Sequence, residues 1–118
     1  MDSEKTILYV DDEEINLILF EEIFNGRFTV FTANSGREGL EFLRTHRDVL
    51  FVISDFRMPG WNGIDFIKKA KDEFPDKNYY ILSGNEMTPE ISDALSKSVI
   101  KKFFRKPVMQ NEIEKALA

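Results

Sequence analysis

Short apolar runs recur along the chain, and within them apolar residues do not alternate with polar ones. They lie at residues 7–10, 28–31, 49–53, 79–82 and 103–104, and the second is the weakest because Thr29 interrupts it. Continuous short runs of this kind are typical of strands buried on both faces, as in a parallel sheet. The pattern therefore predicts five buried strands.

The segments between and after these runs carry apolar residues three or four positions apart, which is typical of amphipathic helices. Five helices are expected, at residues 14–25, 35–45, 63–74, 88–97 and 109–118. The first has an apolar stripe that we expect to face the core, formed by Ile15, Ile18, Leu19 and Ile23. Gly26 follows it as a natural C-terminal stop.

Local signals support two of the helix starts. Ser35 precedes Glu38 by three residues, which fits a capping box, and Pro89 stands at a first helical position. The elements then read (βα)5, an α/β fold. Right-handed crossovers place helices on both sides of a doubly wound, five-stranded parallel sheet.

Composition narrows the class of protein. With 118 residues, 42% of them hydrophobic, the chain is expected to form one domain over residues 1–118 with no output domain. It has no cysteine, which excludes a disulfide scaffold, a thiolate zinc site and cysteine catalysis. No signal peptide is recognisable, and the first apolar run is far too short to span a membrane, so we expect a soluble, cytoplasmic protein.

The net charge of −5 argues against direct nucleic-acid binding, because nucleic-acid affinity depends on neutralising phosphates. One basic cluster stands out, made of Lys97, Lys101, Lys102, Arg105 and Lys106. Charge runs usually form solvated faces. We therefore interpret the cluster as a solvated loop that contains one special lysine.

Polar residues follow the predicted strands where each one ends. Asp11 and Asp12 follow the first, Asp55 the third, Ser83 the fourth and Lys106 the fifth. Ligands bind at the carboxyl ends of strands in such sheets. Three carboxylates are tolerable there around a hard cation such as Mg²⁺, and a carboxylate can also accept a phosphoryl group as a nucleophile. A lysine ammonium and a hydroxyl suit the oxygens of that group.

Each of these residues also has an ordinary structural interpretation. Asp12 suits a helix N-cap, and Asp55 precedes a loop rich in glycine and proline. Taken singly, these interpretations are the better ones. The joint placement of all the polar residues at one end of successive strands is what favours a site.

Four stretches carry a family resemblance that extends over nearly the whole chain. They are residues 7–14 (ILYVDDEE), 55–63 (DFRMPGWNG), 80–84 (YILSG) and 103–107 (FFRKP). With these motifs and their spacing, the chain resembles the response-regulator receiver domains of two-component signalling. The resemblance implies the receiver version of the flavodoxin-like fold.

The resemblance also implies roles at the acidic end. Asp55 would be the phosphoacceptor and a ligand of Mg²⁺. Asp12 would bind the ion directly, Asp11 mainly through water, and Arg57 through its backbone carbonyl. Arg57 and Asn85 would occupy the two variable positions that tune the lifetime of the aspartyl phosphate.

At the other strand ends, the resemblance makes Lys106 the contact to the phosphoryl group, with a cis peptide bond to Pro107. Ser83 would be the switch hydroxyl and Phe103 the switch aromatic residue. The donor would be a phosphohistidine on a sensor histidine kinase or a histidine phosphotransfer protein. His46, the only histidine, is not expected to be that donor.

The expected function is phosphoacceptance that re-shapes the surface of the fourth helix, fifth strand and fifth helix. An output domain, an effector protein or a second copy in a homodimer would bind that surface. Such a domain is not an enzyme, because it catalyses only its own phosphorylation and dephosphorylation.

Three alternatives remain. The first is an interaction module with a receiver fold that works without phosphotransfer. The second is a flavodoxin-like cofactor binder, which the acids at residues 11–14 disfavour because they would repel a phosphate. The third is a metal-dependent aspartyl phosphatase, which needs a second acid shortly after the nucleophile, where this chain has Phe56 and Arg57.

Overall fold

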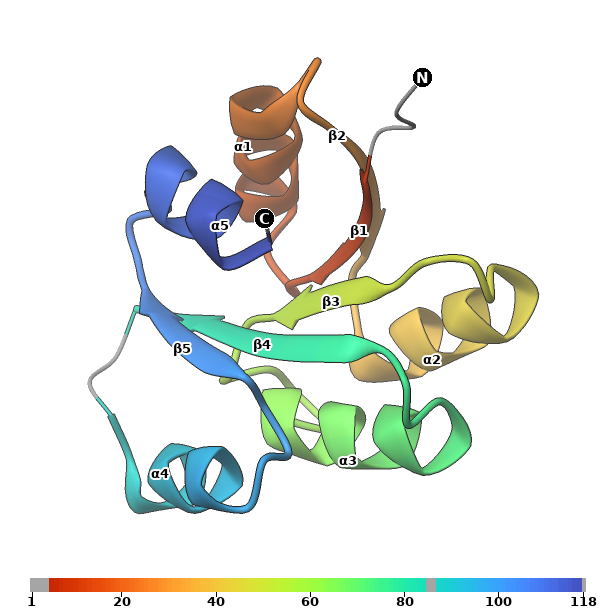
Figure 1. Cartoon of the computed structure of the whole chain (residues 1–118), viewed down its shortest axis with the longest axis vertical. Helices are drawn as coiled ribbons and strands as arrows, with labels where there is room; N and C mark the ends of the chain where they lie inside the picture. Colours follow the sequence, from red (N-terminus) through yellow and green to blue (C-terminus); the bar gives the residue numbers. More distant parts are fainter. Residues whose placement is uncertain (1–4, 85–86, 118) are drawn as a thin grey trace.

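Strands and helices alternate along the chain in the computed structural model, which describes residues 5–84 and 87–117 (Figure 1). The strands are β1 (Lys5–Val10), β2 (Phe28–Ala33), β3 (Phe51–Ser54), β4 (Asn78–Ser83) and β5 (Lys102–Arg105). The helices are α1 (Glu14–Phe24), α2 (Gly36–Thr45), α3 (Gly63–Glu73), α4 (Pro89–Ser96) and α5 (Gln110–Leu117). The predicted (βα)5 order is confirmed.

The strands form one parallel sheet in the order β2-β1-β3-β4-β5. The chain passes from β1 outward to β2 and then returns across β1 to β3. The strand order therefore reverses between β1 and β3, and the carboxyl ends of these two strands mark the switch point where ligands bind in such sheets. None of the helices in the described part of the chain is long and apolar enough to cross a membrane.

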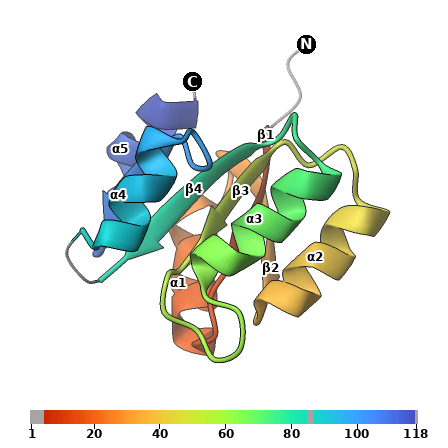
Figure 2. The same ribbon diagram turned by 90° about the horizontal axis from the view of Figure 1, so that it is seen from below.

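Helices cover both faces of the sheet, with α1 and α5 on one side and α2, α3 and α4 on the other (Figures 1 and 2). Along β1, Ile7 and Tyr9 point toward α1, while Leu8 and Val10 point to the opposite core. This alternation follows from the two-residue period of a strand. Because both faces are covered, all four of these residues are buried, as the continuous apolar runs predict.

Helix α1 buries a different face from the one expected. Leu17, Phe20 and Phe24 enter the core, whereas Ile15, Ile18 and Leu19 are 58%, 51% and 51% exposed. Of the expected stripe, only Ile23 packs against the core, where it is partly buried. The other three positions were wrong because α1 is apolar on nearly every side, so its periodicity does not select one face. Burying the two phenylalanines removes more apolar area from water than burying the aliphatic residues would.

Side-chain caps begin α2, α3 and α4, partly as expected, whereas the N-cap residue of α1 makes no side-chain hydrogen bond. Ser35 accepts a hydrogen bond from the Glu38 backbone N–H, but the Glu38 carboxylate accepts from Asn34 and not from Ser35. The predicted capping box at α2 is therefore only half formed. A complete box, which the sequence analysis missed, begins α3, where Asn62 and Asp65 cap each other reciprocally.

Gly63, the first residue of α3, packs directly against the backbone of Asp55. A Cβ atom at this position would lie 2.2 Å from the Asp55 carbonyl oxygen and 2.8 Å from Cδ1 of Ile81. The Gly63 N–H also donates a 2.7 Å hydrogen bond to the Phe56 carbonyl. Only glycine allows this approach, so the loop after β3 is held tightly against the start of α3.

Candidate functional site

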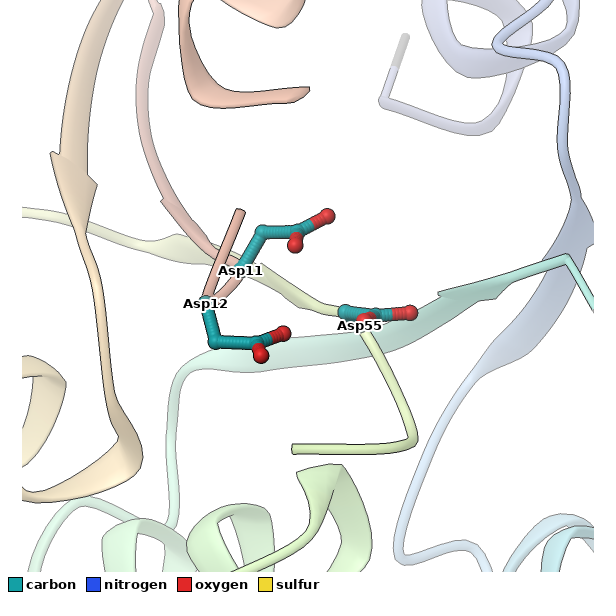
Figure 3. Close-up of side chains that lie close together, drawn as sticks. All are labelled: Asp11, Asp12 and Asp55. Atoms are coloured by element: carbon teal, nitrogen blue, oxygen red, sulfur yellow. The ribbon is translucent and has the colours of Figure 1, made fainter. Parts of the chain in front are cut away.

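Three aspartates meet at the switch point of the sheet. Residues Val10 and Ser54 are partners in the β1–β3 register, so the residues that follow them emerge side by side. One carboxylate oxygen from each of Asp11, Asp12 and Asp55 lies within 4.8 Å of the others (Figure 3). Asp11 and Asp55 are buried, whereas Asp12 is exposed. The cluster therefore opens to solvent at Asp12.

Lys106 reaches this cluster from the end of the edge strand β5. Its backbone N–H donates to the Ser83 carbonyl at 2.8 Å, which places Lys106 just beyond the end of β5. Its Nζ lies 3.1 Å from Oδ2 of Asp11 and 3.4 Å from Oδ1 of Asp55. One ammonium group thus bridges two of the three carboxylates. The Lys106–Pro107 peptide bond is cis, as predicted.

The electrostatics of the site follow from its burial. The pKa of Asp55 is raised to about 6, mainly by burial and also by the neighbouring Asp11, while Lys106 opposes the shift. For Lys106, burial lowers the pKa, but Asp55 and Asp11 more than offset that effect and the net pKa lies above its usual value. Lys106 therefore stays positively charged, and its single positive charge faces a cluster of three carboxyl groups.

The donor set fits a small divalent cation. Carboxylate oxygens are the ligands that Mg²⁺ prefers, and this ion is usually held by one or two carboxylates together with water. The exposed side of Asp12 leaves an approach from solvent. Arg57, whose carbonyl was expected to take part, lies in the loop after β3 with its guanidinium 5.5 Å from the centre of the Phe56 ring.

The other residues predicted for the site are Ser83, Phe103 and Asn85. Ser83 is buried at the end of β4, next to Lys106. Phe103 lies within β5 and packs, half-buried, against the core shared with α2, α3 and α4. Asn85 lies outside the described residues. Their switch and lifetime-tuning roles stay predictions.

Residues that were not expected to take part in the chemistry lie away from the site. His46 follows α2 and stacks on Phe42 at 3.9 Å between ring centroids. In the basic cluster, Lys97, Lys101 and Lys102 are exposed, and Lys97 pairs with Asp93 on its own helix. Of the four lysines in that cluster, only Lys106 turns toward the acids.

Tyr9 is a site residue that the sequence analysis missed. Its hydroxyl donates a 2.6 Å hydrogen bond to Oδ2 of Asp11. Burial raises the pKa of the Tyr9 hydroxyl far above its usual range, and the bond to Asp11 raises it further, so the hydroxyl remains a donor. The sequence did contain a signal for this contact, namely the spacing of Tyr9 and Asp11. Residues two apart on a strand point to the same side.

The fold and the site together define a doubly wound α/β protein with an acidic, lysine-paired centre at its switch point. The family model for the response regulator receiver domain matches residues 7–118. The chain therefore belongs to the receiver-domain family of two-component systems, as the motifs had indicated.

Individual relatives show how such domains occur. The chain is 27% identical over 106 residues to the hydrogenase transcriptional regulatory protein HoxA of Cupriavidus necator, covering 90% of this chain but 22% of that protein. It is 29% identical over 112 residues to the two-component response regulator ORR11 of Oryza sativa subsp. indica, covering 92% of this chain and 76% of the relative. The matching segment therefore makes up most of one relative and a small part of the other.

Among solved structures, the chemotaxis protein CheY4 of Vibrio cholerae has the same fold. The TM-score is 0.86 at 24% sequence identity, and the match covers 98% of this chain and 97% of that one. This agreement confirms the predicted receiver fold.

The raised pKa of Asp55 predicts a pH-dependent stability in metal-free buffer. The protonated form is favoured in the folded state, so the free energy of unfolding should fall as pH rises from about 4 through about 6. Asp55→Asn cannot ionise and should be more stable than the wild type by on the order of 2 kcal/mol at pH 7.5, with the difference vanishing near pH 4. Urea denaturation at both pH values measures this.

The exposed Asp72→Asn variant serves as the control and should follow the wild type at both pH values. Excess Mg²⁺ should reduce the advantage of Asp55→Asn, because the ion stabilises only the ionised carboxylate. Equal stability of wild type and Asp55→Asn at pH 7.5 without metal would contradict the assigned cost of burying the ionised Asp55 carboxylate.

Proposed function

We propose that this receiver domain accepts a phosphoryl group on Asp55, in a Mg²⁺-dependent reaction, from a phosphohistidine of a sensor histidine kinase or histidine phosphotransfer protein. The observation that carries the proposal is the convergence of Lys106 and three aspartates on one strand-end site, with Lys106 Nζ 3.4 Å from Asp55 Oδ1. A nucleophile and a fixed cation beside it are what phosphoryl transfer requires of a protein.

In the proposed reaction an Asp55 oxygen attacks the phosphorus atom, and the bond from phosphorus to the donor's imidazole nitrogen breaks. Asp11, Asp12, Asp55 and the Arg57 carbonyl would hold the ion. When bound, Mg²⁺ neutralises charge on the carboxylates and on the phosphoryl oxygens. Lys106 stabilises the same oxygens and keeps Asp55 ionised before the attack. The domain catalyses only this step and the later hydrolysis.

Phosphorylation by a small-molecule donor tests the chemistry directly. With acetyl phosphate and Mg²⁺, the intact mass of the wild type should increase by one phosphoryl group, and chelation of the metal should abolish the increase. Asp55→Asn should show no increase, and Asp72→Asn should behave as the wild type. No increase in the wild type, despite metal binding shown by titration, would favour the phosphorylation-independent interaction module.

The exposed apolar face of α1 supports docking of a protein donor beside the acceptor. Ile15, Ile18 and Leu19 are each more than half exposed. An apolar groove continues from this face to the site, and it is lined by Tyr9, Asn16, Leu19, Ile23, Lys106, Pro107 and Val108. This apolar surface ends at Lys106, next to the acceptor Asp55. It would suit an apolar helical surface around the donor histidine.

Substitutions on α1 separate docking from chemistry. Ile18→Ser and Leu19→Ser should slow transfer from a phosphorylated kinase by about tenfold or more, because lost apolar contacts weaken the encounter complex. Modification by acetyl phosphate should be unchanged. Leu50→Ser is a matched control, since Leu50 is also 51% exposed but lies before β3. Equal slowing of all three variants would argue against docking at α1.

The same modification is proposed to switch the surface made by α4, β5 and α5. A phosphoryl group adds negative charge and three acceptor oxygens beside Ser83, whose hydroxyl would turn toward it. Phe103 lies opposite Ile81 in the β4–β5 register and would move inward to fill the space left. A second copy, an effector or an output domain would bind the altered surface.

Backbone amide chemical shifts test the switch. Phosphorylation should shift amides in α4, β5 and α5 strongly and those in α2 little, and it should change the dimer fraction in sedimentation. In Ser83→Ala, which keeps Asp55, the shifts in α4 and β5 should shrink although the phosphorylated mass still appears. Shifts confined to the loops around the acids would contradict the proposal.

A further inference from the structure

Tyr9 is held rigidly on the α1 side of β1. Its side chain is 1% exposed, and its ring stacks on Phe20 with 4.2 Å between centroids and 12° between planes. Asp11 lies two residues further along and so emerges on the same side. The stacking therefore holds the Tyr9 hydroxyl in place next to the Asp11 carboxylate.

Donors to Asp11 occupy most of the capacity of its carboxylate. Oδ2 accepts from the Tyr9 hydroxyl at 2.6 Å and from Lys106 Nζ at 3.1 Å, and Oδ1 accepts from the Glu13 backbone N–H at 3.0 Å. A carboxylate offers about four acceptor positions. These three contacts leave roughly one of them, on Oδ1, for anything bound at the cluster.

We propose that Tyr9 is a positioning residue for the metal centre, whose hydroxyl orients Asp11 by occupying Oδ2 and presents Oδ1 to the site. This inference rests on the proposed function, because it assigns a role toward the Mg²⁺ that the function requires. With Oδ2 engaged, Asp11 contributes through its one remaining acceptor position and cannot chelate through both oxygens. The solvent-exposed Asp12 then keeps the freer carboxylate.

The arrangement also explains why one lysine can serve two carboxylates. Lys106 shares Oδ2 of Asp11 with Tyr9, so the lysine is not the sole donor that satisfies this buried oxygen. Its Nζ can therefore remain close to Asp55 as well, at 3.4 Å. Without the Tyr9 hydroxyl, Oδ2 would depend on Lys106 alone, and the ammonium would be drawn toward Asp11.

The variant Tyr9→Phe tests the role, because it keeps the ring and its stacking on Phe20 and removes only the hydroxyl. Calorimetric titration with MgCl₂ should show a dissociation constant about tenfold higher than in the wild type, which is typical for loss of a group that orients a metal ligand. The measurement does not depend on phosphorylation.

Tyr79→Phe is a closely matched control. Tyr79 is also 1% exposed, and its hydroxyl donates 2.7 Å to the Phe74 carbonyl, away from the acids. Both variants lose one buried hydrogen bond and should show similar losses of thermal stability, but only Tyr9→Phe should lose Mg²⁺ affinity. Unchanged or tighter binding in Tyr9→Phe, or equal weakening in both variants, overturns the inference.

The outcomes also separate this inference from the function on which it rests. If the wild type binds no Mg²⁺, the proposed metal-dependent function fails and the role of Tyr9 fails with it. If the wild type binds Mg²⁺ and Tyr9→Phe binds it equally well, only the role of Tyr9 is overturned. Weakened binding in Tyr9→Phe alone supports both.

Discussion

The burial of negative charge in a cluster of three carboxylates at one end of the sheet is the constraint on which this site depends. The β1–β3 register forces Asp11 and Asp55 together, and burial withholds the water that would screen them. At Asp55, the attraction of Lys106 outweighs the repulsion from Asp11, and burial is the larger cost of keeping the carboxylate ionised. The cost of assembling the acids is tolerable because the same charge provides the affinity for a cation. Under the proposed function, stability and chemistry would therefore be opposed in the metal-free domain and aligned when a cation is bound.

Much of this arrangement could be predicted from the sequence. Uninterrupted apolar runs indicated strands buried on both faces, and the polar residues after those runs indicated which end carries chemistry. Strand pairing then brings those residues together without any further information. The prediction succeeded at Asp11, Asp55 and Lys106 because their positions depend on the main chain, which follows regular rules.

The failures have a common physical origin in side-chain packing. Helix α1 is apolar on nearly every side, so only competition with the rest of the core decides that Phe20 and Phe24 enter it and Ile18 does not. Tyr9 looked like an ordinary core residue within an apolar run. Its hydroxyl contacts Asp11 because the two residues lie two apart on one side of β1 and the ring is held against Phe20, a contact that the apolar run alone does not reveal.

The close fit of Gly63 against the Asp55 backbone has a consequence for how a signal leaves the site. The start of α3 is pinned there by the reciprocal cap of Asn62 and Asp65 and by the lack of room for even one extra carbon atom. The side of Asp55 that faces α3 is therefore closely packed. This packing is consistent with the proposal that a change at Asp55 is transmitted toward β4 and β5 and not toward α3.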